Sequence, residues 1–281
     1  MRTDPNDLLE RPGATQAAEL APWQLVDADL PGLPIVAVEA EPEAASESSR
    51  EQRNRWDSFW ARHGQGNGLA NALLWKVRNT LSRRHARILA SALAPVSTSS
   101  NRSPRFIEIG CGSAATSLFI QSGMRDTVAY GIDRSREAVR LARSINPSLR
   151  CVVADAMDLP FAEGAFALAF SSGVIEHFSR EAAGSMLGEH CRVANGRGTT
   201  AVIVPWKYSV FNAIRILVGR LWPFGEEQPF SANELGSFGA EHGLPDLKVH
   251  LVMMSTLLAI GTKARRPKGT PCPDSRVKPT Q

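Results

Sequence analysis

The chain is poor in cysteine and lacks the long apolar run of a membrane-spanning helix. Only four of its 281 residues are cysteines, Cys111, Cys151, Cys191 and Cys272, and no two of them form a C-x-x-C pair. This spacing argues against a disulfide framework and a structural zinc site. No apolar run reaches the roughly 18–20 residues that span a bilayer, and the N-terminus MRTDPNDLLERPG has no signal-peptide core. These absences indicate a reducing compartment, and we expect a cytoplasmic protein.

Acidic and basic residues are unevenly distributed, although the net charge is only +4. Residues 1–50 hold ten acids and three bases, are rich in Pro, Ala, Glu and Ser, and have Trp23 as their only aromatic residue. Such a composition buries too little surface to offset its ordering entropy, so we predict a disordered or loosely ordered acidic segment. Residues 51–95 are basic, and residues 263–281 are expected to form a flexible basic tail. Basic clusters can bind nucleic acid or anionic lipid, but a solvated surface is the favoured interpretation.

The first ordered part of the chain is predicted to be helical. Trp56, Phe59 and Trp60 recur at helical spacing, and a longer helix is expected over residues 69–93, with most of its arginines opposite the apolar stripe. The sequence therefore predicts an N-terminal helical extension over residues 51–95. We interpret its tryptophans as helix-packing residues, and a substrate-facing aromatic is the alternative.

From residue 103 onward, short apolar segments alternate with helical ones. Strands are predicted at 105–109, 127–132, 150–153, 166–171 and 199–204, and helices at 114–122, 135–144 and 180–192. This alternation is typical of βαβ units, which build a parallel sheet with helices on both faces. Residues 231–234 resemble a capping box that opens a further helix. The β-rich runs 246–252 and 255–261 could form an antiparallel pair.

A glycine-rich turn follows the first predicted strand. Gly110-Cys111-Gly112 comes directly after the strand, and small residues then open a helix. Glycines allow the φ angles of a tight turn and let a ligand approach backbone N–H groups. The pattern Gly110-x-Gly112-x-x-Ala115 satisfies the loose dinucleotide fingerprint, but such a short pattern does not distinguish one cofactor from another.

Polar groups also follow the next three predicted strands. Ligands of open α/β sheets bind beyond the carboxyl ends of the strands, so these groups are expected to converge. Asp133 ends the second strand, 21 residues after Gly112, where its carboxylate could accept ribose hydroxyls. Asp155 follows the third strand and could accept a hydrogen bond from an adenine amino group, and Ser172 follows the fourth. One strand-terminal Asp is often only a helix N-cap, but four such strand ends together favour a cofactor site.

Together these motifs resemble those of class I S-adenosylmethionine-dependent methyltransferases. The series is E-x-G-C-G-S-A, G-I-D, D-A-M-D-L-P-F and F-x-L-x-F-S-S-x-V-x-E-H. It is most similar to the small-molecule branch that includes the ubiquinone and menaquinone methylases. The motifs cover residues 104–206, and residues 207–262 match by layout. The resemblance implies an α/β, Rossmann-like, doubly wound sheet of seven mostly parallel strands, the last antiparallel, within a domain over residues 51–262.

The resemblance also implies S-adenosyl-L-methionine as cofactor and a set of residues that bind it. These residues are Glu108, Gly110, Cys111, Gly112, Asp133, Arg134, Asp155, Ala156, Met157 and Ser172. The turn and Glu108 would surround the methionine part of the cofactor. Asp133 would bind the ribose, and Asp155 together with the Ala156 backbone would bind the adenine. Ala114 stands where the family often has a third glycine, a mild change that leaves room for backbone approach. The turn Asn195–Gly198 also departs from the family's P-G-G pattern, which alters a loop but no ligand.

Methyl transfer from a sulfonium is an in-line displacement, so the protein mainly aligns the reactants and excludes water. His177 is the candidate general base for a protonated acceptor, because an unperturbed imidazole titrates near neutrality. A structural histidine at a helix start is the alternative. Glu176-His177 is similar to the E-x-x-E-H metal site of small-RNA methylases, but Gly173 replaces the first acid. We therefore expect no metal.

The acceptor is expected to be a small or medium organic molecule. Residues 207–230 form an apolar, aromatic insertion that could act as a lid, and residues 207–224 could instead rest on a membrane and admit a lipid. Ordinary packing of this insertion is equally compatible with its sequence. An RNA acceptor bound by the basic face of residues 76–87 is disfavoured, because no RNA-binding module is recognised.

Two further classes remain open. A non-catalytic protein that binds S-adenosylmethionine would show the same cofactor motifs. An NAD-dependent oxidoreductase would show the glycine pattern and an acid about 20 residues later. It would not need Glu108 before the turn or the DAMDLPF segment, so it is the least favoured alternative. The sequence leaves the oligomeric state open.

Overall fold

The structure is a computed structural model in which one α/β domain is described. It describes all residues except 1–53, 63–68, 99–102, 125, 220–226 and 263–281. The predicted acidic segment and the predicted basic tail therefore lie outside the described residues. Within the described ranges, no helix is both long and apolar enough to cross a bilayer. The cytoplasmic location stays a prediction, as do the domain boundaries.

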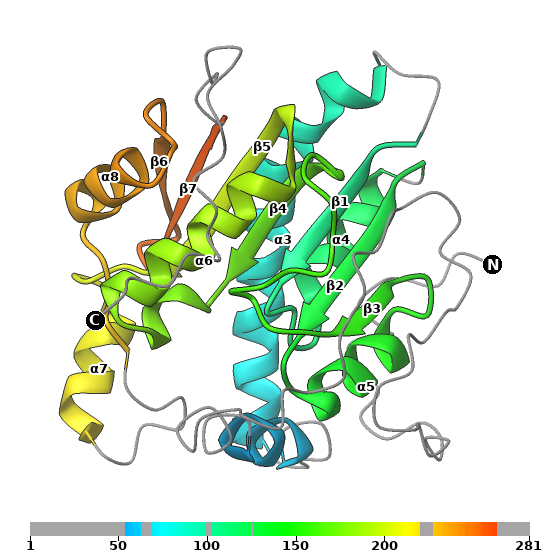
Figure 1. The fold of residues 1–281 in the computed structure, drawn as a ribbon. Coiled ribbons are helices and arrows are strands. Elements are labelled where there is room, and N and C mark those ends of the chain that lie inside the picture. Colours follow the sequence, from blue (N-terminus) through cyan, green and yellow to red (C-terminus); the bar gives the residue numbers. More distant parts are fainter. Residues whose placement is uncertain (1–53, 63–68, 99–102, 125, 220–226, 263–281) are drawn as a thin grey trace, which may run out of the picture.

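Seven strands form one sheet in the order β3-β2-β1-β4-β5-β7-β6 (Figure 1). They are β1 (Arg105–Ile109), β2 (Val128–Asp133), β3 (Arg150–Val153), β4 (Phe166–Ser172), β5 (Ala194–Pro205), β6 (Lys248–Val252) and β7 (Thr256–Thr262). The first five strands pair in parallel, whereas β7 is antiparallel to both β5 and β6. The predicted Rossmann-like, doubly wound sheet with an antiparallel last strand is confirmed.

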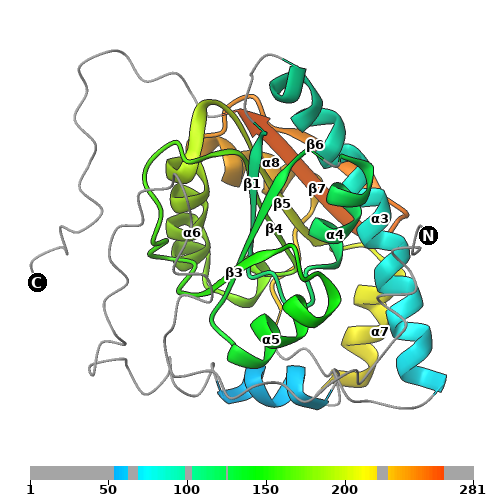
Figure 2. The same ribbon diagram turned by 90° about the vertical axis from the view of Figure 1, so that its right-hand side faces the viewer.

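Helices cover both faces of this sheet (Figure 2). On one face lie α3 (Leu69–Thr98), α4 (Ala115–Gly123) and α5 (Arg136–Ile145), and on the other α6 (Arg180–Val193) and α8 (Ala232–Glu241). Leu89 and Leu93 of α3 are fully buried in the first core, whereas Met186 of α6 and Leu235 of α8 are fully buried in the second. The strands bury apolar side chains on both faces. For this reason their sequences are short, continuous apolar runs and do not alternate between apolar and polar residues.

The N-terminal helical extension is present as a helix of residues 54–62 followed by α3. The insertion after β5 contains α7 (Val210–Val218), and part of it lies outside the described residues. Figure 1 shows the helix of residues 54–62 and α7 at the same end of the sheet, where the parallel strands terminate. Both elements are therefore positioned to build a site at that edge.

Two local predictions have different outcomes. The capping box of α8 is confirmed, since the Ser231 Oγ accepts from the Glu234 N–H (3.2 Å) and the Glu234 Oε2 accepts from the Ser231 N–H (2.7 Å). The turn expected over Asn195–Gly198 is instead an irregularity inside β5. There Phe166 pairs with Ala194 but Leu168 pairs with Thr199, so the residues between them bulge out of the ladder.

Candidate active site

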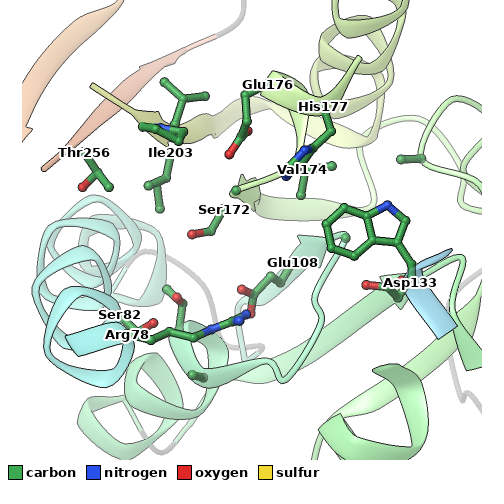
Figure 3. A pocket seen from close by; sticks show the side chains of 18 of the residues that line it. Arg78, Ser82, Glu108, Asp133, Ser172, Val174, Glu176, His177, Ile203 and Thr256 are labelled. Atoms are coloured by element: carbon green, nitrogen blue, oxygen red, sulfur yellow. The ribbon is translucent and has the colours of Figure 1, made fainter. Parts of the chain in front are cut away.

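A cavity lies at the carboxyl ends of the parallel strands. Its walls come from β1, β2, β4 and β5, from α3, and from the helix of residues 54–62. The predicted site residues that line it are Glu108, Gly110, Asp133, Arg134, Asp155, Ala156, Ser172 and His177. Figure 3 shows side chains from these separate elements pointing toward one another. The fold thus gathers groups that are far apart in the sequence at one edge of the sheet.

Three predicted residues do not line this cavity. The Cys111 side chain is buried in the core, where the hydrogen bond with Cys151 and burial raise its thiol pKa well above the ordinary value. The thiol is therefore uncharged and inert, as expected of a packing cysteine. Met157 is exposed, and its N–H donates to the Asp155 Oδ1 (3.0 Å). Gly112 is covered by Trp60, whose Cζ2 would lie 2.4 Å from a Cβ at this position.

The turn after β1 uses left-handed backbone at alternate residues. Gly110 has φ +66°, and a Cβ there would lie 2.6 Å from a methyl carbon of Val174. Glycine is therefore required at this position for both conformation and space. Ala114 also adopts a left-handed φ of 52°, and its N–H donates to the Cys111 carbonyl (2.7 Å). The alanine that replaces the family's usual glycine keeps the backbone path at some cost in strain.

Two buried carboxylates hold this turn in place. The Asp133 Oδ2 accepts from the Gly112 N–H (2.9 Å), and its Oδ1 accepts from the Ser135 N–H (2.9 Å). The Glu108 Oε2 accepts from both the N–H (3.1 Å) and the Oγ (2.5 Å) of Ser117, in the first turn of α4. Burial raises the pKa of Glu108 to about 7 and that of Asp133 to about 6, and these hydrogen bonds oppose both shifts.

Arg78 of α3 lines the cavity and is not among the site residues predicted from the sequence. Its guanidinium lies over the rings of Trp60 and Trp75, at 5.0 and 5.8 Å from the centroids. Burial lowers the Arg78 pKa, whereas the nearby carboxylates of Glu108 and Asp133 raise it. The spacing 75, 78, 82 and 85 places four cavity-lining residues on one face of α3, and this helical spacing could have revealed Arg78.

The helix of residues 54–62 closes one end of the cavity. Trp56 and Trp60 pack in a cluster with Ala138 of α5, as predicted for helix-packing residues, and they also line the cavity, as the alternative interpretation expected. The Trp56 ring packs edge-on against His177, with centroids 5.0 Å apart. The Ser135 Oγ donates to the Asp57 Oδ1 (2.5 Å). This bond ties the helix to the start of α5.

Glu176 lies in the short 3₁₀ helix η1 (Ile175–His177) and is a buried carboxyl group that faces the cavity (Figure 3). Its side chain is 2% exposed, and among the described residues its Oε2 has no hydrogen-bond partner. Burial, with a further contribution from the negative charge of Glu227, raises its pKa to about 8. Glu176 therefore holds a proton at neutral pH in the free protein.

His85 is a second buried polar group on the cavity wall. Its Nε2 lies 2.8 Å from the Thr256 Oγ1, and within the described residues its Nδ1 has no hydrogen-bond partner. Burial lowers the His85 pKa to about 4, so the imidazole is neutral. In the same part of the chain, no three His, Cys, Asp or Glu side chains are arranged to hold a metal ion.

Comparison with protein families and curated proteins points to one kind of domain. Residues 106–198 match a family model described as a methyltransferase domain. Over 100 residues the chain is 32% identical to the tRNA (carboxymethyluridine(34)-5-O)-methyltransferase of Saccharomyces cerevisiae. That stretch covers 36% of this chain and 34% of the yeast protein, so the chain matches about a third of the length of this curated relative.

Solved structures share the fold at low sequence identity. The magnesium protoporphyrin IX methyltransferase of Synechocystis PCC 6803, with bound SAH, has a TM-score of 0.56 and 13% identity, covering 76% of this chain and 99% of its own. The 1,6-didemethyltoxoflavin-N1-methyltransferase of Burkholderia thailandensis has a TM-score of 0.54 and 16% identity. The match covers 87% of this chain and 100% of the Burkholderia protein. At these identities the likeness establishes the fold.

The raised pKa of Glu176 predicts how stability depends on pH. Because the folded pKa (about 8) exceeds the ordinary 4.5, the protonated group favours folding below pH 4.5, and this contribution is lost as pH rises through about 8. Relative to Glu176→Gln, the wild-type free energy of unfolding should fall by several kcal/mol between pH 5 and pH 9, at about 1.4 kcal/mol per pKa unit. Urea unfolding at both pH values measures this difference.

The matched control for this experiment is Glu181→Gln, which removes an exposed carboxylate from the first turn of α6. The difference in the free energy of unfolding between Glu181→Gln and the wild type should stay nearly constant with pH. If the difference in the free energy of unfolding between Glu176→Gln and the wild type is equally independent of pH, the assignment of a buried, protonated Glu176 is wrong.

Proposed function

Because the chain carries a class I S-adenosylmethionine-dependent methyltransferase domain, we propose that it transfers a methyl group to a small or medium organic acceptor bound in the described cavity. The observation that carries the proposal is the convergence of Glu108, Asp133, Asp155 and Ser172 from four successive strand ends on one cavity. Ligands of this kind of sheet bind at that edge. The sulfonium of S-adenosyl-L-methionine supplies the activated methyl group.

The residues present fit this cofactor. The half-buried Arg78 guanidinium would offer a bidentate donor for the α-carboxylate of the methionine part, next to Glu108 and the glycine turn. Asp133, 9% exposed, would accept the ribose hydroxyls with its remaining lone pairs. Asp155 and the Ala156 backbone would bind the adenine, and the Arg134 Nη2 lies 3.6 Å from the Asp155 Oδ2. Arg134 and the exposed Met157 would flank the adenine ring.

The remaining cavity residues would position the acceptor. Ser172 lies between the cofactor residues and Glu176 in Figure 3, and His177 borders the same space. His177 would accept the proton of an acceptor that is protonated at working pH. Trp56 and Trp60 would exclude water from the reacting groups, which strengthens electrostatic interactions inside the cavity.

A tRNA acceptor is the second candidate, and the similarity to the yeast tRNA methyltransferase supports it. Contact with a membrane through residues 207–224 is an alternative for a lipid acceptor. Val210 and Leu217 of α7, 74% and 85% exposed, would then face the lipid. A small acceptor is favoured because the site is a concave cavity with apolar and aromatic walls.

The central test compares cofactors and then measures turnover. We expect calorimetry to detect binding of S-adenosylmethionine and S-adenosylhomocysteine, and no binding of NADH. Transfer of an isotope-labelled methyl group to an acceptor would separate an enzyme from a non-catalytic binding protein. If NADH binds and S-adenosylmethionine does not, the proposed function is wrong.

Asp133→Ala should lose at least about tenfold in S-adenosylhomocysteine affinity, because the variant removes both the ribose acceptor and the support of the Gly112 N–H. Calorimetry measures the affinity, and circular dichroism checks that the variant is folded. The control is Asp246→Ala, an exposed position between α8 and β6. Unchanged affinity in Asp133→Ala would remove the ribose assignment.

Arg78→Ala should also weaken S-adenosylhomocysteine binding by about tenfold or more, since a charge-assisted bidentate pair is lost. The loss should be much smaller for adenosine, which has no carboxylate. Arg84→Ala, an exposed arginine on the same helix, serves as the control and should bind both compounds like the wild type. Equal losses for both compounds in Arg78→Ala would contradict the carboxylate role.

A further inference from the structure

The cavity continues beyond the proposed cofactor residues into a largely apolar half. Its walls there are formed by Leu81, Ile203, Val204, Pro205 and Phe211. Two acidic side chains of this half are almost completely buried: Glu176, at 2% exposure, and Glu227, whose side chain is 5% exposed. Figure 3 shows the carboxyl group of Glu176 directed into the cavity, toward Ser172. A buried polar atom without a partner costs free energy, and this cost is offset when a bound ligand supplies the missing hydrogen bond.

Among the described residues, the charged groups around Glu176 include no basic side chain that forms an ion pair with it. His177 adjoins it on η1, and Glu227 faces it from the segment after α7. Arg215 of α7 pairs with Glu227 rather than Glu176, with its Nε 3.9 Å from the Glu227 Oε2.

The two arginines of the cavity wall interact with other carboxylates. Arg78 interacts with Glu108 and Asp133, and Arg134 with Asp155. The position of Glu176 is also well defined, because its carbonyl accepts from the Gln228 N–H (2.7 Å). A rigid, buried carboxyl group with a second carboxylate nearby is suited to bind a cation or an N–H donor and to reject an anion.

From this geometry we infer that the acceptor is an amine with an aromatic or apolar body, whose ammonium or N–H group binds the carboxyl group of Glu176. The inference rests on the proposed function, since it assigns the acceptor of the same site. The apolar walls would hold the body of the acceptor. The Trp56 ring, which packs on His177 beside Glu176, would favour a cationic head group over a neutral one.

Two isosteric probes test this inference: tryptamine, which carries an ammonium group, and tryptophol, which carries a hydroxyl in its place. Calorimetry on the full chain saturated with S-adenosylhomocysteine at pH 7 should show tryptamine binding at least about tenfold tighter than tryptophol. Glu176→Gln should remove this preference, whereas the matched control Glu181→Gln should keep it.

A second readout is specific to a buried carboxyl group. Because the Glu176 pKa is about 8, binding of the tryptamine cation at pH 7 should displace most of one proton from wild-type protein and none from Glu176→Gln. Calorimetry in buffers of different ionisation enthalpy measures this release. If Glu176 had a merely structural role, the wild type and Glu176→Gln would release the same number of protons when tryptamine binds.

Each remaining outcome counts against the inference. Equal affinity for the two probes, no detectable binding of tryptamine, or an undiminished preference in Glu176→Gln would overturn it. So would a Glu176→Gln variant that weakens S-adenosylmethionine but not S-adenosylhomocysteine, because Glu176 would then serve the sulfonium. Unchanged S-adenosylhomocysteine binding in these experiments separates failure of the amine inference from failure of the proposed function.

Discussion

The two hydrogen bonds accepted by Asp133 are the constraint on which the site depends. One oxygen holds the Gly112 N–H, and the other holds the Ser135 N–H at the start of α5. Ser135 in turn donates to Asp57, so the helix that covers the cavity is joined to the same point. The end of β2 therefore positions the glycine turn, a helix N-terminus and the aromatic cover together. Its buried carboxylate is stabilised by these N–H groups against the cost of desolvation.

The cavity has two halves with different electrostatics. In the half formed by β1, β2 and β3, the carboxylates of Glu108 and Asp133 face Arg78, and Asp155 faces Arg134. In the half formed by β5 and η1, Glu176 has no such partner among the described residues. A half that holds both carboxyl and guanidinium groups is suited to a cofactor that carries both charges. An uncompensated carboxyl group is suited to select one kind of acceptor.

Part of the cavity wall lies outside the segment that the methyltransferase model matches. The methyltransferase model matches residues 106–198, whereas His85, Phe211, Glu227 and Thr256 of the cavity wall lie outside this range.

The sequence by itself determined the sheet, the glycine turn and the strand-end residues such as Asp133 and Asp155. These features follow from local periodicity and from the rule that parallel strands end at one edge. Tertiary structure alone decided that Trp60 covers Gly112 and that the Glu176 carboxyl group is buried with no hydrogen-bond partner for its Oε2 among the described residues. Those outcomes depend on how separate elements pack, and no local pattern records which face of a helix meets a neighbour that is distant in sequence.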